Sequence, residues 1–164
     1  MPRVHSPAPG PRAPNDWPGH SGPAIIAHGG GNTVPLAHDF LHQGADFLEV
    51  DLWLREGQFE ARHERRMRWL PVLFEKWYLR RVPGGRYGLD ELLTETAEHD
   101  AGIFLDLKNG GANAAALLRR VLARTPHPRR VVASSQQWLA LRSIRELLPD
   151  VETFYSIDVR AKLD

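Results

Sequence analysis

The sequence contains no cysteine, which excludes disulfide bridges, thiolate zinc sites and a cysteine nucleophile. It also has no apolar run approaching the roughly 18 residues that a membrane-spanning helix requires. The N-terminus lacks the apolar core of a signal peptide, so we expect a cytoplasmic location. Net charge is nearly absent as well: the value of +1 gives no indication of a nucleic-acid partner.

The 164 residues are enough for one domain with a substantial core, and the hydrophobic fraction of 42% is ordinary for a globular protein. Residues 1–22 differ from the rest because they are dense in proline and glycine and offer little apolar surface. Such a composition predicts an extended or disordered leader. We therefore expect the folded domain to lie within 23–164.

Apolar runs with strand character alternate with segments of helical period along this domain. The predicted strands are 24–28, 46–52, 102–107, 130–135 and 152–157. The predicted helices are 33–44, 89–100, 112–125 and 136–148. This order favours parallel strands joined by helical crossovers, an α/β fold of the TIM-barrel type. A closed barrel needs eight strands and about 250 residues, so we expect an incomplete barrel of about five strands.

Two further segments interrupt this alternation. A short extended piece, 58–63, follows a predicted turn at Glu56-Gly57. The insertion at 65–88 then mixes aromatic residues with flanking arginines. We interpret the insertion as a loop with a short helix packed over the barrel mouth. The alternative is an amphipathic lid that meets lipid or a lipid-derived substrate.

Two carboxylates, Glu49 and Asp51, lie two residues apart on a predicted strand and therefore point to the same face. Burying both on one face is unfavourable unless a cation lies between them. A divalent ion with oxygen ligands resolves this, and carboxylates favour Mg²⁺ or Ca²⁺. Ion pairing with arginines is the alternative explanation.

Asp106 and Lys108 repeat the same spacing on a later strand. Asp106 offers a third carboxylate, and Lys108 places a fixed cation beside it. Together they suit a metal ion and a phosphate oxygen, whereas a simple ion pair inside the barrel is the alternative.

Two histidines end predicted extended segments: His28 ends the first strand, and His63 ends the piece at 58–63. Beside a cluster of carboxylates they are candidates for a general acid and a general base. The glycines that follow His28, at 29–31, would leave backbone amides open to an anion. His38 and His42 have a helical spacing, and we expect them on an outer helix face.

Taken together, these motifs resemble the glycerophosphodiester phosphodiesterase family over about 24–157. The family's first strand ends in His-Arg followed by Glu-Asn-Thr, where this chain has His28-Gly29 and Gly31-Asn32-Thr33. Its Glu-x-Asp metal pair matches Glu49 and Asp51, and its second histidine matches His63. Its acidic-x-Lys strand matches Asp106-Leu107-Lys108, and its strand ending in serine matches 131–135.

The resemblance implies a TIM-barrel hydrolase that cleaves a glycerophosphodiester to glycerol 3-phosphate and an alcohol. It implies a metal held by Glu49, Asp51 and Asp106, an acid/base pair of His28 and His63, and phosphate binding by Lys108. The chain departs from the family at Gly29, where an arginine is expected, and at Gly31, where a glutamate is expected. Arg62 is a substitute for the missing arginine only if it faces inward, whereas strand alternation relative to His63 predicts that it faces outward.

Two alternatives remain open at the level of the sequence. One is a non-catalytic remnant or binding domain that keeps the metal-site residues. The other is a sphingomyelinase-D-like phospholipase, which also has an Asp-x-Lys strand and would act on a lysophospholipid-type substrate. An open five-stranded sheet has two exposed edges, so we also expect possible self-association through them.

Overall fold

A computed structural model describes residues 23–66, 72–75, 78–81, 87–125 and 130–157. The leader predicted at 1–22 lies outside these described residues, so its disorder stays a prediction. In the described part, no helix is both long enough and apolar enough to cross a membrane.

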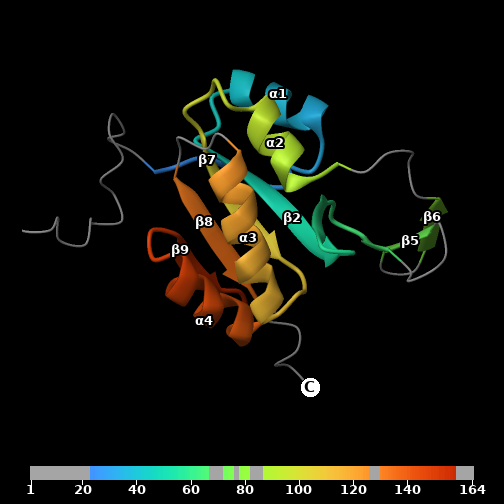
Figure 1. Ribbon diagram of the computed structural model, residues 1–164. Helices are drawn as coiled ribbons and strands as arrows, with labels where there is room; N and C mark the ends of the chain where they lie inside the picture. Colours follow the sequence, from blue (N-terminus) through green and yellow to red (C-terminus); the bar gives the residue numbers. More distant parts are fainter. Residues whose placement is uncertain (1–22, 67–71, 76–77, 82–86, 126–129, 158–164) are drawn as a thin grey trace, which may run out of the picture.

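The main sheet has five parallel strands in the order β1-β2-β7-β8-β9 (Figure 1). The strands are β1 (Ile26–Ala27), β2 (Phe47–Arg55), β7 (Gly102–Leu107), β8 (Val131–Ser135) and β9 (Glu152–Tyr155). This confirms the predicted α/β class and the five parallel strands, although β1 and β9 are shorter than expected. A further strand, β3 (Gln58–Ala61), folds back antiparallel on β2. The predicted turn between them is confirmed: Glu56 and Gly57 both have positive φ, at 49° and 76°, as a two-residue hairpin turn requires.

Four helices connect the parallel strands: α1 (Val34–His42), α2 (Leu89–Glu95), α3 (Ala112–Arg124) and α4 (Trp138–Leu147). Helix α1 begins as predicted, because the Thr33 hydroxyl accepts a hydrogen bond from the Leu36 amide and Pro35 lies in the first turn. Helix α2 ends earlier than the predicted residue 100. The Thr96 hydroxyl donates to the Leu92 carbonyl, and the chain then turns through residues 96–99.

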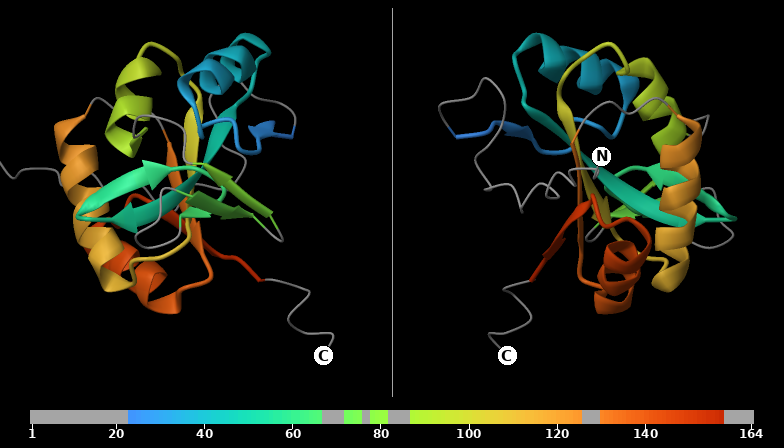
Figure 2. Two further views of the ribbon diagram at one scale, coloured as in Figure 1. Left: turned by 90° about the vertical axis from the view of Figure 1, so that its right-hand side faces the viewer. Right: turned by 60° about the vertical axis from the view of Figure 1, so that its left-hand side comes forward.

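The two faces of the sheet differ in chemistry, because side chains alternate along each strand. One face is apolar and packs under the helices; α3 and α4 lie side by side on it (Figure 2). Its strand residues are fully or almost fully buried and include Leu48, Val50, Leu52, Ile103, Leu105 and Leu107. The opposite face, which corresponds to the lumen of a barrel, carries Glu49, Asp51 and Asp106. The apolar face therefore fixes the register that places these acids together.

Residues 65–66, 72–75 and 78–81 form a small antiparallel sheet of β4 (Arg65–Arg66), β5 (Val72–Glu75) and β6 (Tyr78–Arg81). The short helix predicted within 65–88 is therefore wrong for the described residues. Glu75 pairs with Tyr78, so only two residues separate the paired strands. Val, Phe and Tyr at 72, 74 and 78 are residue types with a high preference for strands, which accounts for strands in place of the expected helix.

Candidate active site

The acidic side chains gather on the lumen face of the sheet, Glu49 and Asp51 in the part of β2 that pairs with β7 and Asp106 near the carboxyl end of β7. Strand pairing sets Asp51 beside Asp106, and Asp106 beside Ser134 on β8. Glu49 lies two residues before Asp51, on the same face of β2. The three carboxylates each offer an oxygen, and these oxygens lie within 4.8 Å of one another. The predicted grouping of Glu49, Asp51 and Asp106 is thus confirmed as a cluster.

The loop between β1 and α1 holds two of these acids in place. The Gly29 amide donates a 2.5 Å hydrogen bond to Glu49 Oε2. Asn32 binds Asp51 at two points: its Nδ2 donates to Asp51 Oδ2 at 2.7 Å, and its Oδ1 accepts from the Asp51 amide at 2.9 Å. Asn32 therefore fixes both the backbone and the carboxylate of Asp51.

The amides of the glycines at 29–31 bond to oxygens of the protein itself and are not open to an external anion. Gly29 has a φ of +68°, and a Cβ on Gly31 would lie 2.8 Å from Val50 Cβ and 3.1 Å from the Glu49 carbonyl oxygen. Their amides bond to Glu49 Oε2, to the Ala27 carbonyl and to the Glu49 carbonyl, respectively. The expectation of amides open to an anion is therefore wrong. In this chain, a side chain at 29 would be strained by the positive φ, and a Cβ at 31 would collide with β2.

Lys108 bridges two of the acids. Its Nζ lies 2.5 Å from Asp51 Oδ1 and 2.5 Å from Asp106 Oδ2. Burial lowers the pKa of Lys108, but hydrogen bonds and charge attraction from Asp106 and Asp51 outweigh burial and raise the pKa above its usual value. Lys108 thus stays charged and balances part of the negative charge.

Two neighbours of these groups position them further. Asn109 pairs with the backbone of Leu54 in both directions, accepting from its amide at 2.6 Å and donating to its carbonyl at 3.0 Å. This ties the segment after β7 to β2 beside Lys108. The Ser134 hydroxyl donates to Asp106 Oδ1 at 3.1 Å.

Glu49 lies in an environment that disfavours its charged form. Its burial raises the pKa of the carboxyl group above the usual value, and repulsion from Asp51 and Asp106 adds to this effect. The Gly29 amide and His28 act in the opposite direction but do not cancel it. A positive charge placed among the acids would favour the charged form.

The cluster suits a divalent cation. Oxygens that lie within 4.8 Å of one another are close enough to share one ion, because ligand oxygens stand about 2.1 Å from Mg²⁺ and about 2.3–2.6 Å from Ca²⁺. Three carboxylates and one lysine leave an excess of negative charge for such an ion to balance. Carboxylate oxygens are also the ligands that hard cations prefer.

The two candidate histidines are placed differently. His28 Nδ1 lies 3.3 Å from Glu49 Oε2, and the His28 side chain is 82% exposed at the rim of the cluster. His63 is exposed and follows Arg62, whose amide donates to the Asp51 carbonyl at 2.9 Å. The backbone at His63 thus runs beside β2 near the acids, and the catalytic role of both histidines stays a prediction.

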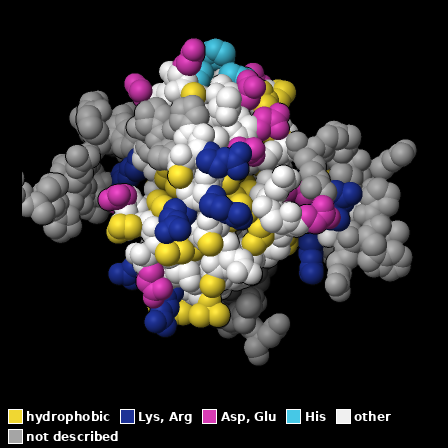
Figure 3. Space-filling view, in the orientation of Figure 1, with side chains coloured by type: hydrophobic (Ala, Val, Ile, Leu, Met, Phe, Trp, Pro, Cys, Tyr) yellow, Lys and Arg dark blue, Asp and Glu magenta, His cyan; other side chains and the backbone are white. Residues whose placement is uncertain are grey.

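Other histidines gather away from the carboxylates. The His99 ring contacts the rings of His38 and His42, with centroids 6.2 and 6.4 Å apart. Figure 3 shows histidine side chains at the surface over α1 and α2. His38 and His42 are thus on an outer face of α1, as expected from the sequence.

Arg62 faces the site, contrary to the expectation from alternation. In the antiparallel hairpin Ala61 pairs with Leu52, and the Arg62 amide bonds to the Asp51 carbonyl, which sets Arg62 beside Asp51. Its side chain is 11% exposed, contacts Glu60 and lines the same hollow as Lys108. The prediction was wrong because it took His63 as the inward residue, although β3 ends at Ala61 before either position.

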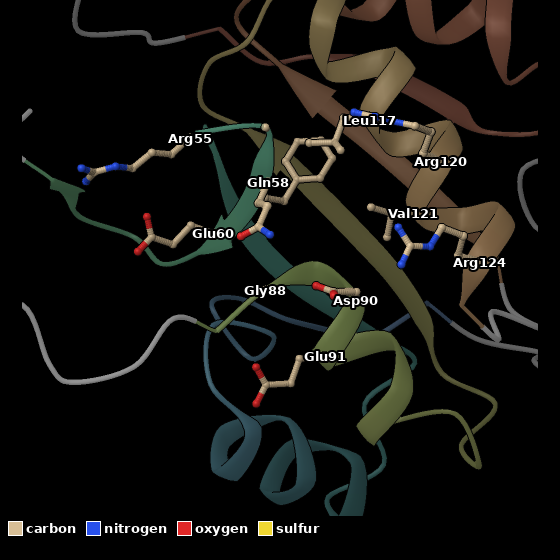
Figure 4. A pocket seen from close by; sticks show the side chains of 12 residues that line it. Arg55, Gln58, Glu60, Gly88, Asp90, Glu91, Leu117, Arg120, Val121 and Arg124 are labelled. Carbon is tan, nitrogen blue, oxygen red and sulfur yellow. The ribbon is translucent and has the colours of Figure 1, made fainter.

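A second hollow, of about 350 Å³, lies between the β2–β3 hairpin and helices α2 and α3 (Figure 4). Asp90 and Glu91 of α2 lie across it from Arg120 and Arg124 of α3. None of the predicted site residues lines it. The predicted site residues therefore lie apart from this hollow.

Sequence reasoning missed the positioning residues Asn32, Asn109 and Ser134. Two of them stand inside motifs of the sequence resemblance, Gly31-Asn32-Thr33 and the serine-ended strand at 131–135. Asn109 directly follows Lys108. None of the three is adjacent to an acidic residue in the sequence, so only the folded arrangement shows that Asn32 and Ser134 donate to carboxylates and that Asn109 bonds to the Leu54 backbone.

Comparison with solved structures finds the same fold in glycerophosphodiester phosphodiesterases. A phosphodiesterase from Oleispira antarctica, solved with its product sn-glycerol-3-phosphate, has a TM-score of 0.63 and 22% identity over 83% of this chain and 66% of that one. An enzyme of this type from Parabacteroides distasonis has a TM-score of 0.64 and 17% identity, covering 80% of this chain and 64% of that one. The glycerophosphodiester phosphodiesterase from Agrobacterium tumefaciens has a TM-score of 0.54 and 20% identity, covering 79% of this chain and 64% of that one.

The chain spans about two thirds of the length of these structures. No protein-family model matches the sequence, and no curated protein matches it closely enough to count as a relative. The chain is thus structurally similar to glycerophosphodiester phosphodiesterases and has an α/β fold whose parallel sheet matches theirs over part of their length.

Proposed function

We propose that the chain is a metal-dependent phosphodiester hydrolase that cleaves glycerophosphodiesters to glycerol 3-phosphate and an alcohol. The observation that carries the proposal is the cluster of Glu49, Asp51 and Asp106 with Lys108 at the strand ends. The phosphodiesterases of similar fold, one of them bound to sn-glycerol-3-phosphate, support the choice of substrate class.

In this proposal, Glu49, Asp51 and Asp106 hold Mg²⁺ or Ca²⁺. The ion supplies polarisation of the phosphoryl group and balances its developing charge. Lys108 donates to a phosphate oxygen from its position between Asp51 and Asp106. Such a contact is electrostatic and needs no proton transfer, which agrees with the raised pKa of Lys108.

His28 and His63 serve in the proposal as the acid/base pair. Glu49 contacts Nδ1 of His28, which leaves Nε2 of that ring for exchange of a proton with the substrate. His63 would carry the second proton transfer, protonating the departing oxygen or activating the attacking one. Because His28 is exposed, substrate binding would also have to shield it from water.

The alternatives differ in what they predict for turnover. A non-catalytic domain would bind metal or phosphate through the same residues without hydrolysis. A sphingomyelinase-D-like phospholipase would prefer a lysophospholipid to its deacylated form.

We also propose a cytoplasmic location and self-association of the chain, the latter because Phe154 and Tyr155 on β9 are 52% and 53% exposed.

The test is hydrolysis by the purified 164-residue chain of glycerophosphocholine, glycerophosphoethanolamine and glycerophosphoglycerol with Mg²⁺ or Ca²⁺. We expect release of glycerol 3-phosphate, and a loss of at least a hundredfold in His28→Ala. His42→Ala on α1 is the matched control and should keep full activity, since His42 contacts His99 away from the carboxylates. A folded chain without turnover would contradict the proposal and favour the binding domain.

A further inference from the structure

Three histidines from two segments of the chain meet at the surface, apart from the carboxylate cluster. His38 and His42 lie on α1, and the His99 ring contacts both of their rings, with centroid distances of 6.2 and 6.4 Å. Figure 3 shows histidine side chains gathered over α1 and α2, with acidic side chains beside them. The proposed reaction uses none of these three histidines, so their grouping needs another explanation.

The two histidines of α1 lie on one face of that helix. They are four residues apart, and side chains with this spacing have Cβ atoms about 5–6 Å apart. Pairs of helical histidines with the same spacing bind zinc in metalloproteases. His42 is exposed and His38 is half-buried, whereas Ala37 turns a different face of the helix to the core. The pair is therefore open to an ion from solvent.

The third histidine is positioned by a turn that the core anchors. Thr96 is fully buried, and its hydroxyl donates to the Leu92 carbonyl at 2.7 Å. The His99 amide then donates to the Thr96 carbonyl at 3.1 Å, which closes the turn after α2. The backbone of His99 is thus fixed by the fold, and its half-buried ring supplies a ligand from outside α1.

The three rings need only small rotations to share one ion. Zinc stands about 2.0–2.1 Å from each histidine nitrogen, so two rings on a tetrahedral zinc ion have centroids about 5 Å apart. The observed centroid distances are longer than this by about 1 Å. The rings also meet edge to face, so their nitrogens converge only after rotation about the side-chain bonds. None of the three side chains is buried, which permits such rotation.

We propose that His38, His42 and His99 bind a divalent transition-metal ion of the kind that imidazole prefers, with Zn²⁺ as the probe. The carboxylate cluster prefers Mg²⁺ or Ca²⁺, so the two sites differ in metal. They also differ in place: His42 and His99 come shortly before β2 and β7 begin, whereas Asp106 lies near the carboxyl end of β7. The amino ends of barrel strands serve stability, so the ion joins α1 to the segment before β7.

The test is calorimetric titration of the 164-residue chain with Zn²⁺, in an excess of Ca²⁺ that competes for the carboxylate cluster. His99→Ala should weaken zinc binding about tenfold or more, since even the loss of a residue that supports a metal ligand costs about that much. This variant is decisive, because an ion held by α1 alone would keep its affinity. His63→Ala removes a histidine outside the group and is the matched control, which should bind as the wild-type chain does.

Two further measurements identify the ligands and the role of the ion. In NMR spectra of the ring nitrogens, Zn²⁺ should shift the signals of His38, His42 and His99, and Ca²⁺ should leave them unchanged. Zn²⁺ should also raise the Tm of the wild-type chain and not that of His99→Ala, because the ion binds only the folded arrangement. Zinc affinity that is unchanged in His99→Ala would overturn the proposal. So would zinc shifts confined to other histidines.

The outcome is independent of the proposed function. Glu49→Gln removes a carboxylate from the cluster and should still bind Zn²⁺ at the histidines with the wild-type affinity, because the two sites share no residue. Zinc binding at the three histidines in a chain without hydrolysis would support the histidine site and contradict the hydrolase. Hydrolysis with Mg²⁺ or Ca²⁺ by a chain whose three histidines bind no zinc would do the reverse.

Discussion

The variant Glu49→Gln should be more stable than wild type without metal and less stable than wild type with metal. Oxygens of the three acids lie within 4.8 Å, and two unit charges at 4.8 Å repel by about 3.5 kcal/mol at an effective dielectric constant of about 20. Glu49→Gln removes this repulsion but weakens the bond from the Gly29 amide, a charge-assisted contact of about 1.5–3 kcal/mol. The net expectation is a gain of about 1 kcal/mol in EDTA, or roughly 3 °C in Tm.

Metal should reverse this order. An ion at a hundred times its Kd stabilises the wild-type chain by about 2.7 kcal/mol, or roughly 8 °C in Tm. Glu49→Gln lacks one of three carboxylate ligands and should gain much less. Thermal unfolding of both chains in EDTA and in Mg²⁺, Ca²⁺ or Mn²⁺ shows whether the order of their stabilities reverses. Glu98→Gln removes an exposed acid and is the control, which should follow the wild-type chain under both conditions.

The metal-free difference should also depend on pH. Because the pKa of Glu49 is raised on folding, the folded state binds the proton more tightly than the unfolded state does. The destabilisation from Glu49 is therefore absent at low pH and appears as pH rises above the ordinary value of 4.5. Wild type and Glu49→Gln should converge in acid. Two results together would refute this reasoning. The Tm of the wild-type chain would not change with any of the three ions, and Glu49→Gln would be less stable than wild type in EDTA.

Two further predictions concern the support of the site and the exposed sheet. Asn32→Ala removes a charge-assisted bond to Asp51 and leaves the Asp51 amide without its acceptor, so thermal unfolding should show a loss of about 3 kcal/mol; an unchanged Tm would contradict the positioning role. Light scattering at rising concentration should show a mass above the 18.5 kDa of one chain, and Tyr155→Asp should lower it; a monomer at every concentration would contradict self-association.

The sequence predicted the parallel strands and the acidic cluster because both depend on simple periodicities. Residues two apart on a strand share a face, so Glu49 and Asp51 had to point together. Asp106 joined them because parallel strands of one sheet align their carboxyl ends. The apolar residues on the helix-covered face, such as Leu48 and Leu105, then fixed the register without any information from the site.

The loop between β1 and α1 shows what periodicity does not predict. A glycine run has no side chains to indicate a direction, so open amides and close packing were equally compatible with it. The packing decides: Gly31 approaches β2 so closely that a Cβ would collide with Val50. The small sheet at 65–81 was missed for a different reason, since short strands with aromatic residues and helices with aromatic residues look alike over so few positions.

Arg62 illustrates most clearly why the candidate site needed the structure. Alternation was counted from His63, on the assumption that the histidine faces inward. The direction of a side chain is set by the partner strand, however, and here the Arg62 amide bonds to the Asp51 carbonyl. An arginine beside Asp51 and within the hollow of Lys108 adds positive charge next to the carboxylate cluster. The left-handed turn at Gly29 and the inward arginine at 62 are therefore two parts of one arrangement, in which the first loop holds the acids and the β2–β3 hairpin supplies the positive charge.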